Sequence, residues 1–178
     1  MSRYFVDKSY YFVTVPTNKR YHFFNSNTKK KIILDQINRV CNAYNLKEFN
    51  FGIISNHYHF VAYFKEGSIM PKILKQINGR SSYELNKLTD NKKEVWGEYY
   101  IYLIEDDVLL AKALGYVVGN PLKHKEIKSF KELEKYPFSS YKSLIKRMDK
   151  KDVNQYIRSV INIRENDFTA SNFKVRCE

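Results

Sequence analysis

Two histidines that lie close together in the sequence have side chains suited to binding a metal ion. His57 and His59 are two residues apart in an apolar segment. If that segment is a β-strand, both side chains project from the same face of the sheet. Two imidazoles arranged in this way can hold a divalent metal ion through their nitrogen atoms. Paired histidines in strands are more often ordinary surface or core residues, so this pair is a weak signal by itself.

Tyr116 is the second candidate, and it lies toward the end of a helical segment between Gly115 and Gly119. Glycine costs roughly 1 kcal/mol relative to alanine in a helix, but it would let another backbone, including a nucleic-acid strand, come close. Asn120 follows Tyr116 by one helical turn, so its amide oxygen could serve as a third metal ligand. The alternative is structural, because Asn120-Pro121 would also end a helix and Tyr116 is one of 15 tyrosines.

The strands that would position these residues are predicted from β-branched and aromatic runs at 10–15, within 49–64 and at 96–104. Ser55-Asn56 interrupts the second run. That run is therefore either two strands joined by a tight turn or one strand with a bulge.

Helical spacing of apolar residues predicts five helices, at 27–44, from 68 to 79 or 88, at 107–120, at 139–148 and at 153–163. Asp106 or Asp107 can cap the helix that carries Tyr116. Pro121 disfavours helical geometry at Asn120, so this helix should end there. A polar tail follows the last helix.

The order of these elements predicts an α+β fold. The series β-α-β-β-α-β is that of a ferredoxin-like sandwich with an antiparallel sheet, here extended by a tyrosine-bearing helix and C-terminal helices. We expect one domain over 1–178, with a core over about 5–145 and a helical extension and tail over about 146–178. Such a fold hosts many functions, so the site must decide among them.

The net charge points to a polyanionic partner. The chain has 31 Lys+Arg and 19 Asp+Glu, which gives a net charge of +12. Such a surface binds nucleic acid favourably, because neutralising the phosphates releases their counterions. The alternative is a Lys-rich surface that only aids solubility. The two cysteines suggest neither a disulfide framework nor a zinc site. No stretch has the length of a membrane span or the apolar core of a signal peptide, so we expect a cytoplasmic, nucleoid-associated protein.

Four blocks of the sequence together resemble the single-tyrosine HUH transposases, and the REP-associated tyrosine transposases in particular. These blocks are Ser-Asn-His-Tyr-His-Phe-Val (55–61), Val-Trp-Gly-Glu-Tyr-Tyr (95–100), Tyr-Val-Val-Gly-Asn-Pro-Leu-Lys (116–123) and Tyr-Pro-Phe-Ser-Ser-Tyr (136–141). The resemblance covers roughly residues 5 to 145. Ser55, Gly119 and Tyr136 depart from the family pattern without removing a catalytic group, so we expect an active enzyme.

The resemblance implies a metal-dependent endonuclease and strand transferase that acts on single-stranded DNA, commonly beside a hairpin. His57, His59 and Asn120 would hold Mg²⁺ or Mn²⁺ against the scissile phosphate. Tyr116 would attack phosphorus, forming a 5′-phosphotyrosine and leaving a free 3′-OH. Neither the general base, the target sequence nor the choice between monomer and homodimer follows from the sequence.

Basic residues that could contact the DNA backbone lie on the second predicted helix and just after the tyrosine block. They are Lys72, Lys75, Arg80, Lys123, His124 and Lys125. For each of them a solvated surface position is an equally good explanation.

Two other functions remain open. A non-catalytic nucleic-acid-binding module could use the same sheet, because such sheets also combine basic charge with strand aromatics. A domesticated derivative that binds genomic repeats would share these sequence blocks. Other HUH nucleases, such as replication initiators, usually carry extra domains.

Overall fold

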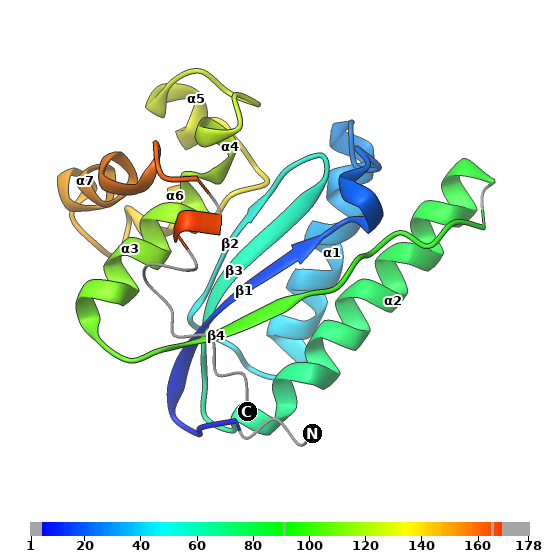
Figure 1. The fold of residues 1–178 in the computed structure, drawn as a ribbon, viewed down its shortest axis with the longest axis horizontal. Helices are drawn as coiled ribbons and strands as arrows, with labels where there is room; N and C mark the ends of the chain where they lie inside the picture. The colour runs from blue at the N-terminus through cyan, green and yellow to red at the C-terminus, as the bar shows by residue number, and fades with distance from the viewer. Residues whose placement is uncertain (1–4, 91, 165, 169–178) are drawn as a thin grey trace.

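The computed structural model describes residues 5–90, 92–164 and 166–168, in which four strands form one antiparallel sheet. The strands are β1 (Ser9–Pro16), β2 (Phe49–Ile53), β3 (His57–Phe64) and β4 (Tyr100–Ile104). Their spatial order is β2-β3-β1-β4, and each neighbouring pair is antiparallel. This is the arrangement of a ferredoxin-like β-α-β-β-α-β fold, so the predicted fold class is confirmed (Figure 1).

Two long helices, α1 (Asn27–Ala43) and α2 (Met70–Thr89), cover one face of the sheet. The other face carries α3 (Asp107–Val118) and α7 (Lys150–Val160), as Figure 1 shows. The shorter elements are η1 (Asn18–Arg20), η2 (Gly67–Ile69), α4 (Asn120–Lys123), α5 (Phe130–Lys135) and α6 (Tyr141–Leu144). The helices added after β4 therefore build a second layer, and helices pack on both faces of the sheet.

Alternation along β3 distributes its side chains between the two layers. Tyr58, Phe60 and Ala62 pack in the core beneath α1 and α2, whereas Val61 packs in the core shared with α3 and α7. His57 and His59 share the face of Val61 because residues two apart in a strand point the same way. The histidines consequently lie under the layer that carries Tyr116.

The structure resolves the alternatives in the first half of the chain. The run over 49–64 is two strands joined by a tight turn at Ser55-Asn56, where the Ile54 N–H donates to the His57 carbonyl at 3.0 Å. The second long helix continues beyond Gly79 to Thr89. It ends where Asp90 adopts a left-handed conformation (φ 49°), which aspartate tolerates better than most residues.

The predicted strand at 96–104 was too long. Only Tyr100–Ile104 pairs with β1, and Trp96 makes a single bridge to Thr17. The Trp96 ring is instead drawn into the core, where it stacks on Phe24 and its indole N–H donates to Ser81. Burying a large aromatic ring with its polar atom satisfied outweighs further ladder pairing at this position.

The tyrosine helix and the C-terminal helices also differ in their bounds. The tyrosine helix α3 ends at Val118, and the short helix α4 begins at Asn120. Pro121 is compatible with this second helix because proline is tolerated in the first turn. Helix α5 was not predicted, and the predicted helices at 139–148 and 153–163 are α6 and α7 with shifted bounds. Of the predicted polar tail after the last helix, residues 165 and 169–178 lie outside the described residues. Within the described part of the chain, no helix is both long and apolar enough to cross a membrane.

Candidate active site

Three different elements bring the sequence-predicted histidines, tyrosine and asparagine to one buried place. The rings of His57 and His59 on β3 have centroids 4.6 Å apart, and the centroids of His59 and Tyr116 are 5.4 Å apart. Asn120, at the start of α4, lies beside β2, the strand paired with β3. The exposed fraction of each of these four residues is 1% or less. One chain thus supplies the whole group.

Gly52 on β2 allows the corner between α3 and α4 to press directly against the sheet. A Cβ atom at this position would collide with the Val117 carbonyl oxygen and lie 3.3 Å from the Asn120 Cβ. Gly52 is also the register partner of His59. The missing side chain therefore sets how closely the asparagine approaches the histidine strand.

The first prediction follows from this contact. We expect Gly52→Ala to lower the free energy of unfolding by about 2–3 kcal/mol, because overpacking a close backbone contact forces a shift. Gly79→Ala is the matched control, since a Cβ atom at that helical position meets nothing within 4 Å. It should raise the free energy of unfolding by about 1 kcal/mol. Urea denaturation measures the free energy of unfolding of both variants. Equal changes in this free energy for Gly52→Ala and Gly79→Ala would contradict the packing argument.

A hydrogen bond to the preceding residue, Asn56, orients the His57 ring. Its Nδ1 lies 2.8 Å from Asn56 Oδ1, and the Asn56 amide nitrogen donates to the Arg20 carbonyl at 3.4 Å. This orientation presents an acceptor oxygen to the ring, so His57 Nδ1 carries the proton and Nε2 keeps its lone pair. His59 Nδ1 lies 3.0 Å from the hydroxyl of Thr14 on β1. Such partners hold metal-binding imidazoles in one tautomer.

Burial lowers the pKa of His59 well below its ordinary value. The positive charges of His124, Arg20 and Lys123 lower this pKa further, while a backbone hydrogen bond with Val13 opposes them. His59 is therefore neutral near pH 7, and a neutral imidazole is the form that binds a metal ion. Arg20 and Lys123 also supply positive charge that would attract a phosphate.

The ring of Tyr116 is enclosed on several sides. Phe168 stacks on it with ring centroids 4.2 Å apart, and Phe12 of β1 meets it edge-on at 5.9 Å. Lys123 Nζ lies 5.4 Å from the ring centroid and donates to the carbonyls of Ile161 and Ile163. The Tyr116 hydroxyl oxygen is buried from solvent. The structure therefore holds the tyrosine in a closed environment.

The glycines beside Tyr116 have a structural explanation. A Cβ atom at Gly115 would collide with the backbone of Tyr156, and one at Gly119 would lie 2.7 Å from the Ile157 side chain. Both neighbours belong to α7. The prediction that another backbone comes close is confirmed at Gly115, where that backbone belongs to the protein helix α7.

Asn120 has the features expected of a metal ligand. Its amide oxygen and nitrogen are both buried, and neither has a hydrogen-bond partner in the described part of the chain. An unsatisfied buried amide costs free energy unless something binds it. No group of three or more His, Cys, Asp or Glu side chains among the described residues is arranged to hold a metal ion. The possible donors that lie here are the imidazole nitrogens of His57 and His59 and the amide oxygen of Asn120.

The six predicted DNA contacts fall into two groups. His124 lies at the site, with its ring centroid 4.8 Å from that of His57, and Lys123 and Lys125 flank it. Lys72, Lys75 and Arg80 lie on α2, which covers the opposite face of the sheet from Tyr116 (Figure 1). The structure does not bring this second group to the tyrosine.

Sequence reasoning missed several residues that shape the site, including Thr14, Arg20 and Phe168. Thr14 is the register partner of His59, so a prediction of strand pairing would have identified it. Arg20 and Phe168 reach the site from a 3-10 helix and from a segment after α7, and no periodic pattern marks either of them.

Comparison with known proteins adds the following findings. The family model described as "Transposase IS200 like" matches residues 5–118, which is more than half of the chain. A solved REP-associated tyrosine transposase bound to a REP hairpin is similar, with a TM-score of 0.66 and 19% identity over 83% of this chain and 85% of that one. A Deinococcus radiodurans R1 protein assigned as a transposase gives a TM-score of 0.46 and 15% identity over 65% and 93%. No curated protein matches this chain.

Proposed function

This chain belongs to the IS200-like transposase family, and from that premise we propose that it cuts and rejoins single-stranded DNA through Tyr116. The observation that carries the proposal is the position of Tyr116 beside the two histidines within one chain. The ring centroids of Tyr116 and His59 are 5.4 Å apart, and those of His59 and His57 are 4.6 Å apart. A non-catalytic DNA-binding module would have no need for this buried group of reactive side chains.

Cleavage is an exchange of one phosphodiester for another. Tyr116 Oη attacks phosphorus, the bond from phosphorus to the 3′ oxygen breaks, and the tyrosine becomes linked to the 5′ phosphate. The hydroxyl proton is lost to solvent and the departing 3′ oxygen takes one up, so no external energy source is needed. Attack by another 3′-OH reverses the step and joins strands.

The chain's own residues would bind and orient the phosphate. His57, His59 and Asn120 would hold Mg²⁺ or Mn²⁺, which neutralises phosphate oxygens when bound. Lys123, above the Tyr116 ring, adds positive charge beside the attacking tyrosine. His124 and Arg20 extend this positive field toward the DNA backbone.

The buried hydroxyl of Tyr116 requires a movement before attack. Phe168 and Lys123 lie over the ring; Phe168 belongs to the segment that follows α7, and Lys123 is held by carbonyls of that segment. Core strand residues such as Phe12 form the other side of the enclosure. We therefore assign DNA entry to displacement of Ile161, Ile163 and Phe168 from the Tyr116 ring and Lys123.

The substrate that we propose is single-stranded DNA next to a hairpin. The similar solved transposase is described as bound to a REP hairpin, and this chain carries a net charge of +12. Lys123, His124 and Lys125 are the backbone contacts we place nearest the cleaved bond, whereas Lys72, Lys75 and Arg80 would contact only DNA that extends around the sheet. Activity on DNA would keep the protein with the nucleoid.

The experiment is a search for the covalent intermediate. Single-stranded hairpin DNAs from the genomic flanks of the gene, labelled at either end, are incubated with Mg²⁺, Mn²⁺ or EDTA and separated on a denaturing gel. We expect a metal-dependent adduct that carries the 3′ fragment. Salt-sensitive binding of the same DNAs with no adduct under any metal condition would instead support the non-catalytic, repeat-binding derivative.

A further inference from the structure

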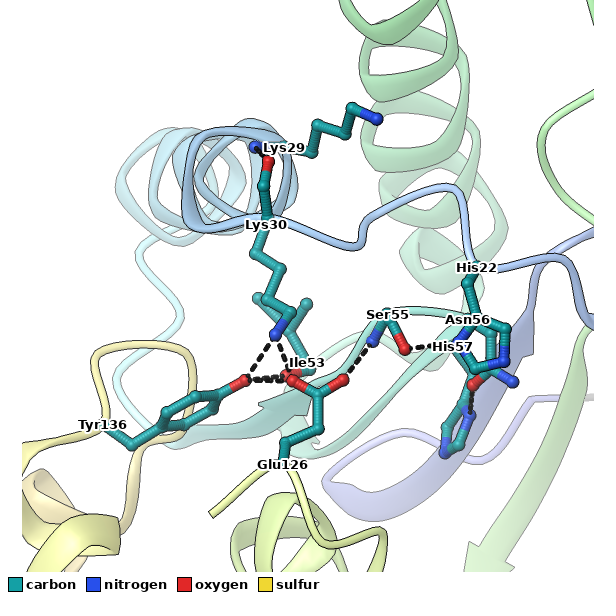
Figure 2. Close-up of polar contacts among 10 residues, drawn as sticks. His22, Lys29, Lys30, Ile53, Ser55, Asn56, His57, Glu126 and Tyr136 are labelled. Carbon is teal, nitrogen blue, oxygen red and sulfur yellow. Dashed lines mark hydrogen bonds and ion pairs between the residues drawn. The ribbon is translucent and has the colours of Figure 1, made fainter.

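A buried ion pair outside the group of His57, His59, Tyr116 and Asn120 connects α1 to the chain that follows the tyrosine helix. Lys30 Nζ of α1 contacts Glu126 Oε2 and donates to the Tyr136 hydroxyl at 3.1 Å (Figure 2). The Tyr136 hydroxyl lies 3.0 Å from Glu126 Oε2 and 3.1 Å from the Ile53 carbonyl oxygen. The side chains of Lys30 and Glu126 are only 9% and 15% exposed, so water screens their charges poorly.

Both Glu126 and Tyr136 are held in defined protonation states. Burial would raise the pKa of Glu126, but hydrogen bonds from Lys30 and from the Ser55 N–H lower it below its ordinary value. Burial, followed by the negative charge of Glu126, raises the pKa of Tyr136. Glu126 is therefore an ionised acceptor and Tyr136 a neutral hydroxyl at physiological pH.

The second oxygen of Glu126 reaches the turn that precedes the first histidine. Glu126 Oε1 accepts from the Ser55 N–H at 2.7 Å, as Figure 2 shows. Ser55 and Asn56 form the tight turn between β2 and β3, and Asn56 Oδ1 holds His57 Nδ1. The carboxylate therefore acts on the backbone of the same turn that sets the tautomer and direction of the His57 ring.

The backbone of Glu126 is attached to the other side of the site. Its N–H donates to the carbonyl of Pro121, the residue directly after Asn120, at 3.0 Å. One residue thus contacts the segment that carries the asparagine through its backbone and the histidine turn through its side chain. Glu126 and Ser55 are 71 positions apart in the sequence, so a rigid link between these two segments has to be made by contacts of this kind.

We propose that Glu126 is a positioning residue that sets the distance between Asn120 and His57 and so the affinity of the site for a divalent metal ion. The inference rests on the proposed function, because it assigns these two residues to the metal. A buried ion pair is weak evidence for stability, since well-packed apolar residues often serve as well. We assign the Lys30–Glu126 pair a different role, which is to hold Glu126 Oε1 where it accepts the Ser55 N–H. Partners beyond the metal ligands themselves typically change metal affinity by 10–100-fold when lost.

Two double variants separate this positioning from the stability of the ion pair. Lys30→Met with Glu126→Gln removes both charges but keeps an acceptor for the Ser55 N–H. Lys30→Met with Glu126→Leu removes the charges and the acceptor together. Neither variant leaves a buried charge without its partner, which is the usual reason for failure to fold. Glu134→Gln is the control, because it breaks an exposed ion pair between Lys150 and the neighbouring α5.

The measurement is the dissociation constant of Mn²⁺, from the electron paramagnetic resonance signal of the free ion, with urea denaturation of each variant alongside. We expect the Glu126→Leu variant to bind Mn²⁺ about 10-fold or more weakly, and the Glu126→Gln variant and the control to stay within about 3-fold of the wild type. Hairpin DNA binding in EDTA should be the same for all.

Equal Mn²⁺ affinities of the two double variants would overturn the positioning role and leave the proposed function in place. A wild-type chain that binds no Mn²⁺ and forms no adduct would overturn the proposed function, and the positioning role with it. The two failures are therefore distinguished by the wild-type measurement.

Discussion

Replacing Tyr116 by phenylalanine is expected to abolish covalent capture of DNA, by a factor on the order of 10⁴ or more. The variant lacks the only atom that we propose to bond to phosphorus. The ring itself remains, so its stacking on Phe168 at 4.2 Å and its edge contact with Phe12 are preserved. The free energy of unfolding and the affinity for hairpin DNA should change little.

Tyr102→Phe is a suitable control for this prediction. Tyr102 lies on β4, and its ring also stacks on Phe12, with centroids 5.9 Å apart. It should retain wild-type adduct formation on the same denaturing gel. Adduct formation by Tyr116→Phe would assign the nucleophile to another tyrosine, with Tyr102 the first to test. Tyr58 is a weaker alternative because it lies in the core beneath α1 and α2 and donates to Asn78.

His57→Ala is expected to lose metal-dependent cleavage by roughly 10³-fold while DNA binding persists. A metal ion stabilises the charge of a reacting phosphate by several kcal/mol, and each 1.4 kcal/mol corresponds to about a factor of ten in rate. Binding depends instead on Lys and Arg at phosphates, so its salt dependence should keep the slope of the wild type.

Fluorescence anisotropy over a series of salt concentrations, together with single-turnover cleavage, measures both parts of this prediction. His22→Ala is the matched control. His22 is an exposed histidine whose Nδ1 lies 2.7 Å from the Ser55 hydroxyl, and it has no place in the proposed donor set. A His57→Ala variant that cleaves at the wild-type rate would remove His57 from the metal site.

The parts of the site that could be predicted depend on residues that lie close together in the sequence. The spacing of His57 and His59 places both on one strand face, and Asn120 follows Tyr116 by one helical turn. The order of strands and helices was enough to predict the antiparallel sheet that brings these segments together. Each of these inferences needs only a periodicity or a short motif.

The parts that could not be predicted depend on pairs of side chains far apart in the chain. Lys30 and Glu126 are 96 positions apart, and a lysine in an amphipathic helix is normally expected at the surface. Helical periodicity indicates which face is apolar but not which polar group will be buried beside it. The close approach of α7 to Gly115 could not be predicted either. A glycine in the sequence does not identify which segment packs against it.

In the proposed mechanism, a site assembled within one chain sets the stoichiometry of the reaction. Because His57, His59, Tyr116 and Asn120 lie together in a single folded chain, the proposed mechanism gives one reactive centre for each chain. The proposed centre has one nucleophilic tyrosine, so one molecule would retain only one severed strand at a time. Under the proposed mechanism, exchange between two DNA ends would proceed in succession at one centre or draw on a second molecule, and the released strand would carry a free 3′-OH meanwhile.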